Sequence, residues 1–125
     1  MSLDITPLVP AGRQVIEAYG GGGFVVAGTR HAGSILVWPE RTVAWAVATP
    51  DGITETALQA LFAPAPEILV VGCGARFAAA PAALRAALKM RGLALEWMTT
   101  GAACRTFNVL LAEGRACAAA LIAVS

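Results

Sequence analysis

At 125 residues the chain is long enough for one domain with its own core, and 58% of its residues are hydrophobic against 14% charged. A small domain this apolar cannot bury all of its apolar surface, which predicts an exposed patch used for self-association, as a dimer or higher oligomer, or for contact with another protein. The net charge of +1, without any run of Lys or Arg, leaves no basic surface for nucleic acid.

Membrane, secretory and metal-binding patterns are not apparent in the sequence. The longest apolar run, residues 116–124, falls short of the roughly 18 residues of a membrane span and predicts a buried strand. The first residues do not show the basic and then apolar pattern of a secretory signal, so we expect a cytoplasmic protein. Cys73, Cys104 and Cys117 fit neither a disulfide framework nor a zinc pattern, and the chain has one His. We therefore expect no metal site and no cofactor.

The first half of the chain predicts antiparallel strands joined by glycine-rich or proline-rich turns. Residues 1–12 indicate an irregular arm. Strands are expected at residues 14–19, 24–28, 34–38 and 42–47, and turns at residues 20–23, 29–33 and 49–52. The four glycines at 20–23 favour a hairpin turn over a phosphate-binding loop, because a strand pattern follows them where a phosphate motif needs a helix.

The second half predicts a β-α-β-α-β unit, preceded by a short helix at residues 55–62 that Thr54 caps. Its strands are expected at residues 67–72, 93–98 and 116–124, and its helices at residues 82–91 and 102–112. Such units form parallel strands with right-handed crossovers. The sequence therefore predicts a single three-layer α/β domain, residues 1–125, with a central mixed sheet to which the first half adds antiparallel hairpins.

Polar groups that can bind a ligand concentrate in the two turns at residues 72–76 and 99–105. Ligands of open α/β sheets bind beyond the carboxyl ends of parallel strands, and the free N–H groups that begin the second helix add positive potential there. If the two preceding strands are neighbours, these turns line one crevice for a small molecule or anion. The candidate binding residues are Gly72, Gly74, Arg76, Thr99, Thr100, Gly101, Ala102, Cys104, Arg105 and Asn108.

Each of these residues also has a structural interpretation. Thr100 is most simply the N-cap of the helix, and Cys104 is more readily a buried, inert thiol than a nucleophile. Arg76 and Arg105 are more readily ion-pair partners of nearby carboxylates than ligands of an anion. Asn108, one turn after Cys104, is expected to point at the same turn. Because the carboxylates are scattered and no Ser-His-Asp set is evident, we assign no catalytic residue and favour binding over catalysis.

The run Glu96–Arg115, EWMTTGAACRTFNVLLAEGR, is similar to a long motif close to E-x-M-D-T-G-A-A-x-R-T-Y-N-x-L. That motif belongs to the complex I assembly factor 3 family, a domain of unknown function that includes the adipogenesis-associated domain proteins and uncharacterised bacterial and archaeal members. Residues 20–24, 31–34 and 68–74 also fit the family pattern, so the resemblance covers residues 5–124. Thr99 stands where many members carry an acidic residue, and Cys73 where Thr is common.

The resemblance implies a bacterial member with a single α/β domain and no established enzymatic activity. Mitochondrial members look like assembly factors that act by contact with other proteins during biogenesis of respiratory complex I, which implies peripheral contact with a membrane complex. Our first hypothesis is therefore a protein-interaction or assembly-helper domain. The second is a small-molecule or anion-binding domain that uses the crevice between the turns, and an enzyme that uses Cys104 ranks third.

Overall fold

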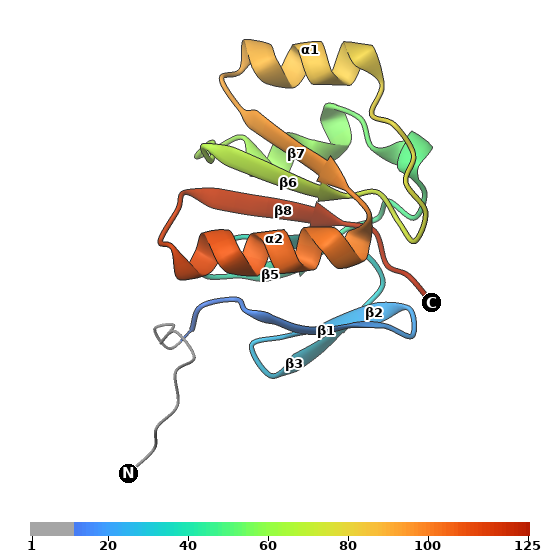
Figure 1. Cartoon of the computed structure of the whole chain (residues 1–125), viewed down its shortest axis with the longest axis vertical. Coiled ribbons are helices and arrows are strands. Elements are labelled where there is room, and N and C mark those ends of the chain that lie inside the picture. Colours follow the sequence, from blue (N-terminus) through green and yellow to red (C-terminus); the bar gives the residue numbers. More distant parts are fainter. Residues whose placement is uncertain (1–11) are drawn as a thin grey trace.

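The computed structural model describes residues 12–125, which form a five-stranded mixed sheet and a separate three-stranded antiparallel sheet (Figure 1). The arm predicted for residues 1–12 lies outside the described residues, apart from Gly12. In chain order the elements are β1 (Ile16–Gly20), β2 (Gly23–Val26), β3 (Thr29–Ala32), β4 (Ile35–Val37), β5 (Thr42–Ala44), the 3-10 helices η1 (Pro50–Gly52) and η2 (Thr56–Leu61), β6 (Ile68–Gly72), α1 (Ala82–Met90), β7 (Ala94–Met98), α2 (Thr100–Ala112) and β8 (Cys117–Leu121).

The predicted β-α-β-α-β unit is confirmed as β6-α1-β7-α2-β8. Strand β6 runs parallel to both β7 and β8, and β4 pairs antiparallel with the far side of β8, so the larger sheet has the order β5-β4-β8-β6-β7. Every residue of β6 and of β8 is buried, as their continuous apolar runs predict for central strands. The carboxyl ends of β6, β7 and β8 therefore meet at one edge of the sheet.

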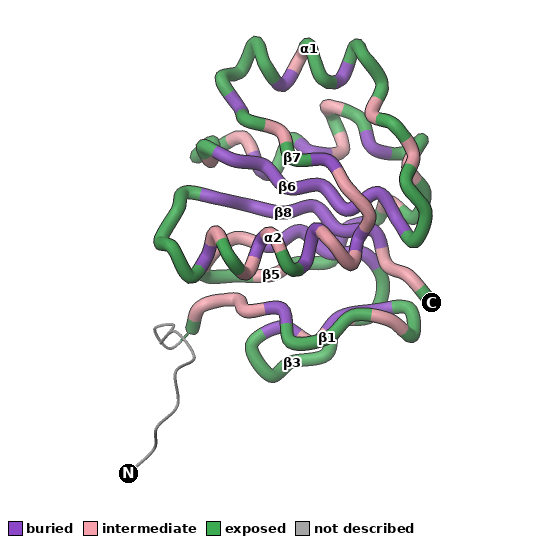
Figure 2. The backbone as a smooth tube through the Cα atoms, viewed as in Figure 1, coloured by how far each residue is buried: buried purple, intermediate pink, exposed green. Residues whose placement is uncertain are grey.

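The predicted three layers are also confirmed, because both faces of the larger sheet are covered (Figure 2). On one face, α1 and η2 bury a core that includes Leu58, Leu69 and Leu88. On the other face, α2 and the sheet β1-β2-β3 share a core that includes Phe24 and Phe107, both fully buried. The small sheet thus packs on the same face as α2, and this contact brings the first half of the chain to the carboxyl edge.

Two expectations, one for the first half and one for the short helix that follows it, need correction. The predicted turn at residues 29–33 is wrong, because Thr29–Ala32 forms β3 and pairs with β2. The chain reverses earlier, at Ala27 and Gly28, whose φ angles are 47° and 80°. This left-handed pair makes the tight reversal that a two-residue hairpin needs. The short helix predicted at residues 55–62 is the 3-10 helix η2, and the Thr54 hydroxyl does accept a hydrogen bond from the Ala57 N–H at 3.1 Å.

Candidate functional site

The two glycine-containing turns lie side by side, because β6 and β7 are neighbouring parallel strands. The Cys73 N–H donates to the Met98 carbonyl at 2.8 Å, which joins the start of one turn to the end of the strand before the other. The Ile122 N–H donates to the Gly72 carbonyl at 3.0 Å, which adds the end of β8 to the same edge. The structure therefore brings together the two predicted turns, as the candidate crevice requires.

Thr100 occupies the centre of this edge, and its predicted role as the N-cap is wrong. The N-cap of α2 is Thr99, and Thr100 is the first residue of the helix, with no exposed surface. Its hydroxyl donates to the Ile122 carbonyl at 2.8 Å and accepts from the Gly74 N–H at 3.1 Å, while its own N–H donates to the Gly74 carbonyl at 2.9 Å. Thr100 thus joins the ends of β6 and β8 to the start of α2.

The close packing of the end of β6 against Thr100 also explains why a glycine ends this strand. A Cβ atom at Gly72 would lie 2.9 Å from the Thr100 Cα, closer than real Cβ contacts allow, and it would make a tight contact of 3.1 Å with Leu121 Cδ2. Gly72 therefore permits the strand and the helix start to approach. The Gly74 N–H and carbonyl are also bonded to Thr100. These backbone groups of the first turn are therefore not free to bind a phosphate.

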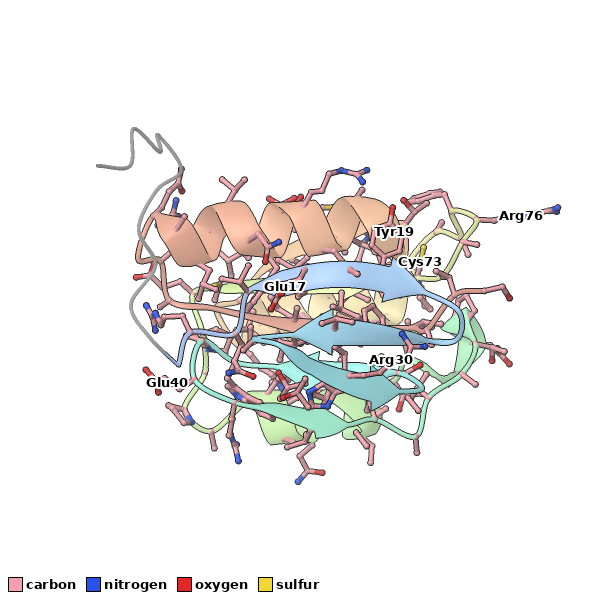
Figure 3. All side chains as sticks on the ribbon, turned by 90° about the horizontal axis from the view of Figure 1, so that it is seen from below. Glu17, Tyr19, Arg30, Glu40, Cys73 and Arg76 are labelled. Carbon is pink, nitrogen blue, oxygen red and sulfur yellow. The ribbon has the colours of Figure 1, made fainter. Side chains whose placement is uncertain are left out.

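Tyr19 covers the other side of the start of α2, and sequence reasoning missed it. A Cβ atom at Gly101 would lie 2.5 Å from the Tyr19 hydroxyl oxygen, so Gly101 gives the ring its place against the helix. Arg105 Nη1 donates to the same hydroxyl at 3.5 Å. Figure 3 shows Tyr19 between β1 and the helix. Residues about 80 positions apart make this contact, and no motif or periodicity links them.

Asn108 holds β1 against α2, and it does not point at the turn as predicted. Its Oδ1 accepts from the Ile16 N–H at 2.9 Å, and its Nδ2 donates to the Ile16 carbonyl at 2.8 Å. Beside this pair lies a shallow hollow of about 290 Å³. Its lining residues are Ile16, Glu17, Ala18, Tyr19, Cys104, Arg105 and Asn108.

Cys104 is buried, as its structural interpretation predicts. Burial raises the pKa of this thiol from its ordinary value of 9.0 to about 12, and the neighbouring Arg105 guanidinium offsets only part of that shift. The thiolate is the nucleophilic form of cysteine. The environment of Cys104 therefore opposes a nucleophilic role near neutral pH.

We expect Cys104 in the folded protein to react with iodoacetamide much more slowly than in the urea-unfolded chain at pH 9, measured by peptide mass spectrometry. Between pH 9 and pH 12 the unfolded chain releases a proton that the folded protein retains, so this thiol lowers the free energy of unfolding as the pH rises through that window. Replacing Cys104 with alanine should make the pH dependence shallower there. Equal alkylation rates in the two states would contradict this account.

The two arginines lie in the walls of different hollows. Arg105 lines the hollow beside Asn108, whereas Arg76 lines a second one, of about 410 Å³, beyond the carboxyl ends of β6 and β8. Arg76 is exposed and projects away from the fold (Figure 3). Within residues 12–125 neither arginine forms an ion pair with a carboxylate. Thr99 and Ala102 lie at the start of α2 and are half-buried.

Residues 12–125 hold no group of three His, Cys, Asp or Glu side chains placed to share a metal ion. None of the helices described there has the length and apolar character needed to cross a bilayer.

Residues 16–122 match the profile of a family described as "Protein of unknown function (DUF498/DUF598)". The chain is 38% identical over 109 residues to human NADH dehydrogenase [ubiquinone] 1 alpha subcomplex assembly factor 3. That match covers 86% of this chain and 59% of the human protein, so the chain spans only part of the length of this relative. It is also 37% identical over 112 residues to an uncharacterized protein of Rhodobacter capsulatus, covering 90% of this chain and 86% of that protein.

Solved structures share the fold over nearly the whole chain. A crystal structure from Bartonella henselae, described as an outer membrane protein, aligns with a TM-score of 0.84 and 39% identity, over 92% of this chain and 98% of that one. A solution NMR structure from Bordetella pertussis, described as a Mth938-like domain, aligns with a TM-score of 0.82 and 30% identity, over 98% of this chain and 92% of that one. The paired sheets and helices are therefore shared with proteins of related sequence.

Proposed function

The chain belongs to the DUF498/DUF598 family, and from this membership we propose that it is an assembly helper, which binds another protein while a respiratory NADH dehydrogenase is built. The observation that carries the proposal is the 38% identity to the human assembly factor across 86% of this chain. The proposal places the chain in the bacterial cytoplasm, where it meets the membrane-bound enzyme from outside the bilayer.

The surface of the fold supports a role in protein contact. Large apolar side chains are exposed on β1, β5, α1, α2 and the loop after β6. Contact with water does not stabilise such side chains, whereas burial does. These exposed residues are Tyr19, Val43, Phe77, Met90 and Val109. A partner subunit, or a second copy of this chain, would bury such side chains, and self-association therefore forms part of the same proposal.

Deleting the gene from a host that has a respiratory NADH dehydrogenase tests the proposal. We expect assembled enzyme on native gels, and membrane NADH oxidation, to fall several-fold and to recover when a plasmid supplies the chain. Succinate dehydrogenase in the same membranes is the control and should not change. Full assembly in the deletion strain would overturn the proposal.

The second candidate function, binding of a small molecule or anion, is favoured by one observation: the two turns do lie together at the carboxyl ends of parallel strands. Against it, Thr100 and Gly74 hydrogen bond within the fold, and Arg76 and Arg105 line separate hollows. Calorimetric titration with phosphate separates the two functions, because only an anion site would give heat that disappears in the Arg76→Ala and Arg105→Ala variants.

A further inference from the structure

Strand β5 forms one edge of the larger sheet, and its outer side has no partner strand in the described part of the chain. The sheet has the order β5-β4-β8-β6-β7, so β5 pairs with β4 on one side only. Val43 and Ala44 are both exposed on this edge. An open, apolar edge of this kind is a ready template for a further strand.

The register of the β4-β5 hairpin shows which backbone groups of β5 face outward. The Trp45 N–H donates to the Ser34 carbonyl at 2.9 Å. In an antiparallel pair every second residue makes such bonds, so residues 41, 43 and 45 bond inward to β4. The N–H and C=O groups of Thr42 and Ala44 therefore point away from β4, and they form no other hydrogen bond within residues 12–125.

The remaining edges of the two sheets are protected. β7, at the opposite edge of the larger sheet, carries the exposed Glu96, and β3 carries the exposed Arg30. Charged side chains on an edge strand are a common protection against unwanted pairing. β1 is attached to α2 through Asn108. Among the described strands, β5 is therefore the edge strand with neither a charged residue nor an attachment to a helix.

A second copy of β5 is complementary to this edge when the two strands run antiparallel about a twofold axis at Val43. Thr42 then lies opposite Ala44 of the second copy, and the outward groups form about four N–H···O=C hydrogen bonds. On the face that η2 covers, Val43 lies opposite its own copy, and Arg41 lies opposite Trp45. Both cross-strand pairs are favourable, and the two arginines stand at opposite ends of the paired strands, so like charges do not meet.

We infer that β5 is the surface through which two copies of this chain associate, by antiparallel pairing that continues the larger sheet from one copy into the next. The inference rests on the self-association included in the proposed function, and it names the surface and the geometry. Interfaces carry about one hydrogen bond per 100–200 Å², so about four such bonds indicate a small contact. A small contact gives a weak dimer, which should dissociate on dilution.

Sedimentation velocity between about 1 μM and 1 mM should therefore show a dimer that dissociates on dilution, because weak interfaces have dissociation constants in this range. Val43→Lys brings two positive charges together at the twofold axis. Ala44→Pro removes an outward N–H without removing a bond to β4. Each substitution should raise the dissociation constant at least about tenfold.

Val109→Lys and Ala94→Lys are the matched controls. Val109 is an exposed apolar residue of α2, and Ala94 is exposed on the opposite edge strand β7. Both substitutions add the same charge as Val43→Lys, and neither should change the dissociation constant. Circular dichroism melts of the four variants check that each is folded.

Amide hydrogen exchange of the unmodified chain tests the pairing itself. The outward N–H groups of Thr42 and Ala44 should exchange more slowly at high protein concentration, whereas the Val43 N–H, which bonds to β4, should not change. A dimer that persists in both variants, or that leaves Thr42 and Ala44 unprotected, would overturn the inference and place self-association at another surface.

A chain that stays monomeric at every concentration would overturn the inference together with the self-association part of the proposed function. If its Thr42 and Ala44 amides then become protected only when solubilised NADH dehydrogenase is added, the edge binds a different protein. The assembly role is tested separately by the deletion strain, so its failure and the failure of this inference give different results.

Discussion

Replacing Thr100 with valine is expected to lower the free energy of unfolding by about 2–4 kcal/mol, with the shape of the side chain almost unchanged. The substitution removes the hydroxyl that donates to the Ile122 carbonyl and accepts from the Gly74 N–H. Thr100 has no exposed surface, so water cannot replace the lost partner. A buried donor or acceptor left without a partner costs about 1–3 kcal/mol, and this substitution leaves two such groups.

Urea denaturation followed by Trp fluorescence measures the change. Thr106→Val is the matched control, because Thr106 lies on the same helix, is only half-buried and donates its hydroxyl to the Met98 sulfur at 3.2 Å. We expect that control to change stability by less than about 1 kcal/mol. Thr100→Ser keeps the hydroxyl and should restore part of the loss. A Thr100→Val protein as stable as the Thr106→Val protein would refute the structural role.

The layout of the second half was predictable because each element carries its own signal. The apolar run in β6 indicates a strand buried on both faces, and Leu84 and Leu88 mark the buried side of α1. The handedness of β-α-β crossovers then leaves few ways to arrange β6, β7 and β8. Local pattern and general topology together therefore predicted parallel strands in one mixed sheet. The neighbouring positions of β6 and β7, on which the meeting of the two turns depends, were only a condition of the prediction and are given by the structure.

The hairpins of the first half were less predictable because short turns compete with one another. Gly28 and Gly33 both have positive φ, at 80° each, and either can reverse the chain. In the structure the chain reverses at Gly28, so that Phe24 pairs with His31 and also lies in the core shared with α2. Residues 29–33 do not indicate these contacts by themselves.

The candidate site, like the fold, was predicted from the sequence only in part. Sequence reasoning placed Gly72, Gly74 and Thr100 at one edge, and the structure does bring them together. The Thr100 hydroxyl and the Gly74 backbone bond to each other, and both connect the strand ends to α2. The motif alone could not distinguish this structural role from ligand binding.

Replacing Asn108 with alanine is expected to lower the free energy of unfolding by about 2–4 kcal/mol and to loosen the small sheet β1-β2-β3. The amide both accepts from the Ile16 N–H and donates to the Ile16 carbonyl, and Ile16 is 5% exposed. Removing it leaves both backbone groups without partners. Because the register between β1 and β2 is already irregular between Ile16 and Ala18, the β2 strand supports this end of β1 incompletely. The amide of Asn108 therefore adds two hydrogen bonds between this end of β1 and α2.

Native-state hydrogen exchange separates this local effect from a global one. The Ile16 amide and its neighbours in β1–β3 should exchange faster in Asn108→Ala, by a larger factor than amides of β6 and β8, because the larger sheet retains its own pairing. Val109→Ala, at an exposed position of the same helix, should leave both sets unchanged. Equal acceleration across both sheets would mean that Asn108 stabilises the fold as a whole. Selective loss in β1–β3 would show that this sheet can open away from α2, which would uncover Phe107 and the Cys104 thiol together.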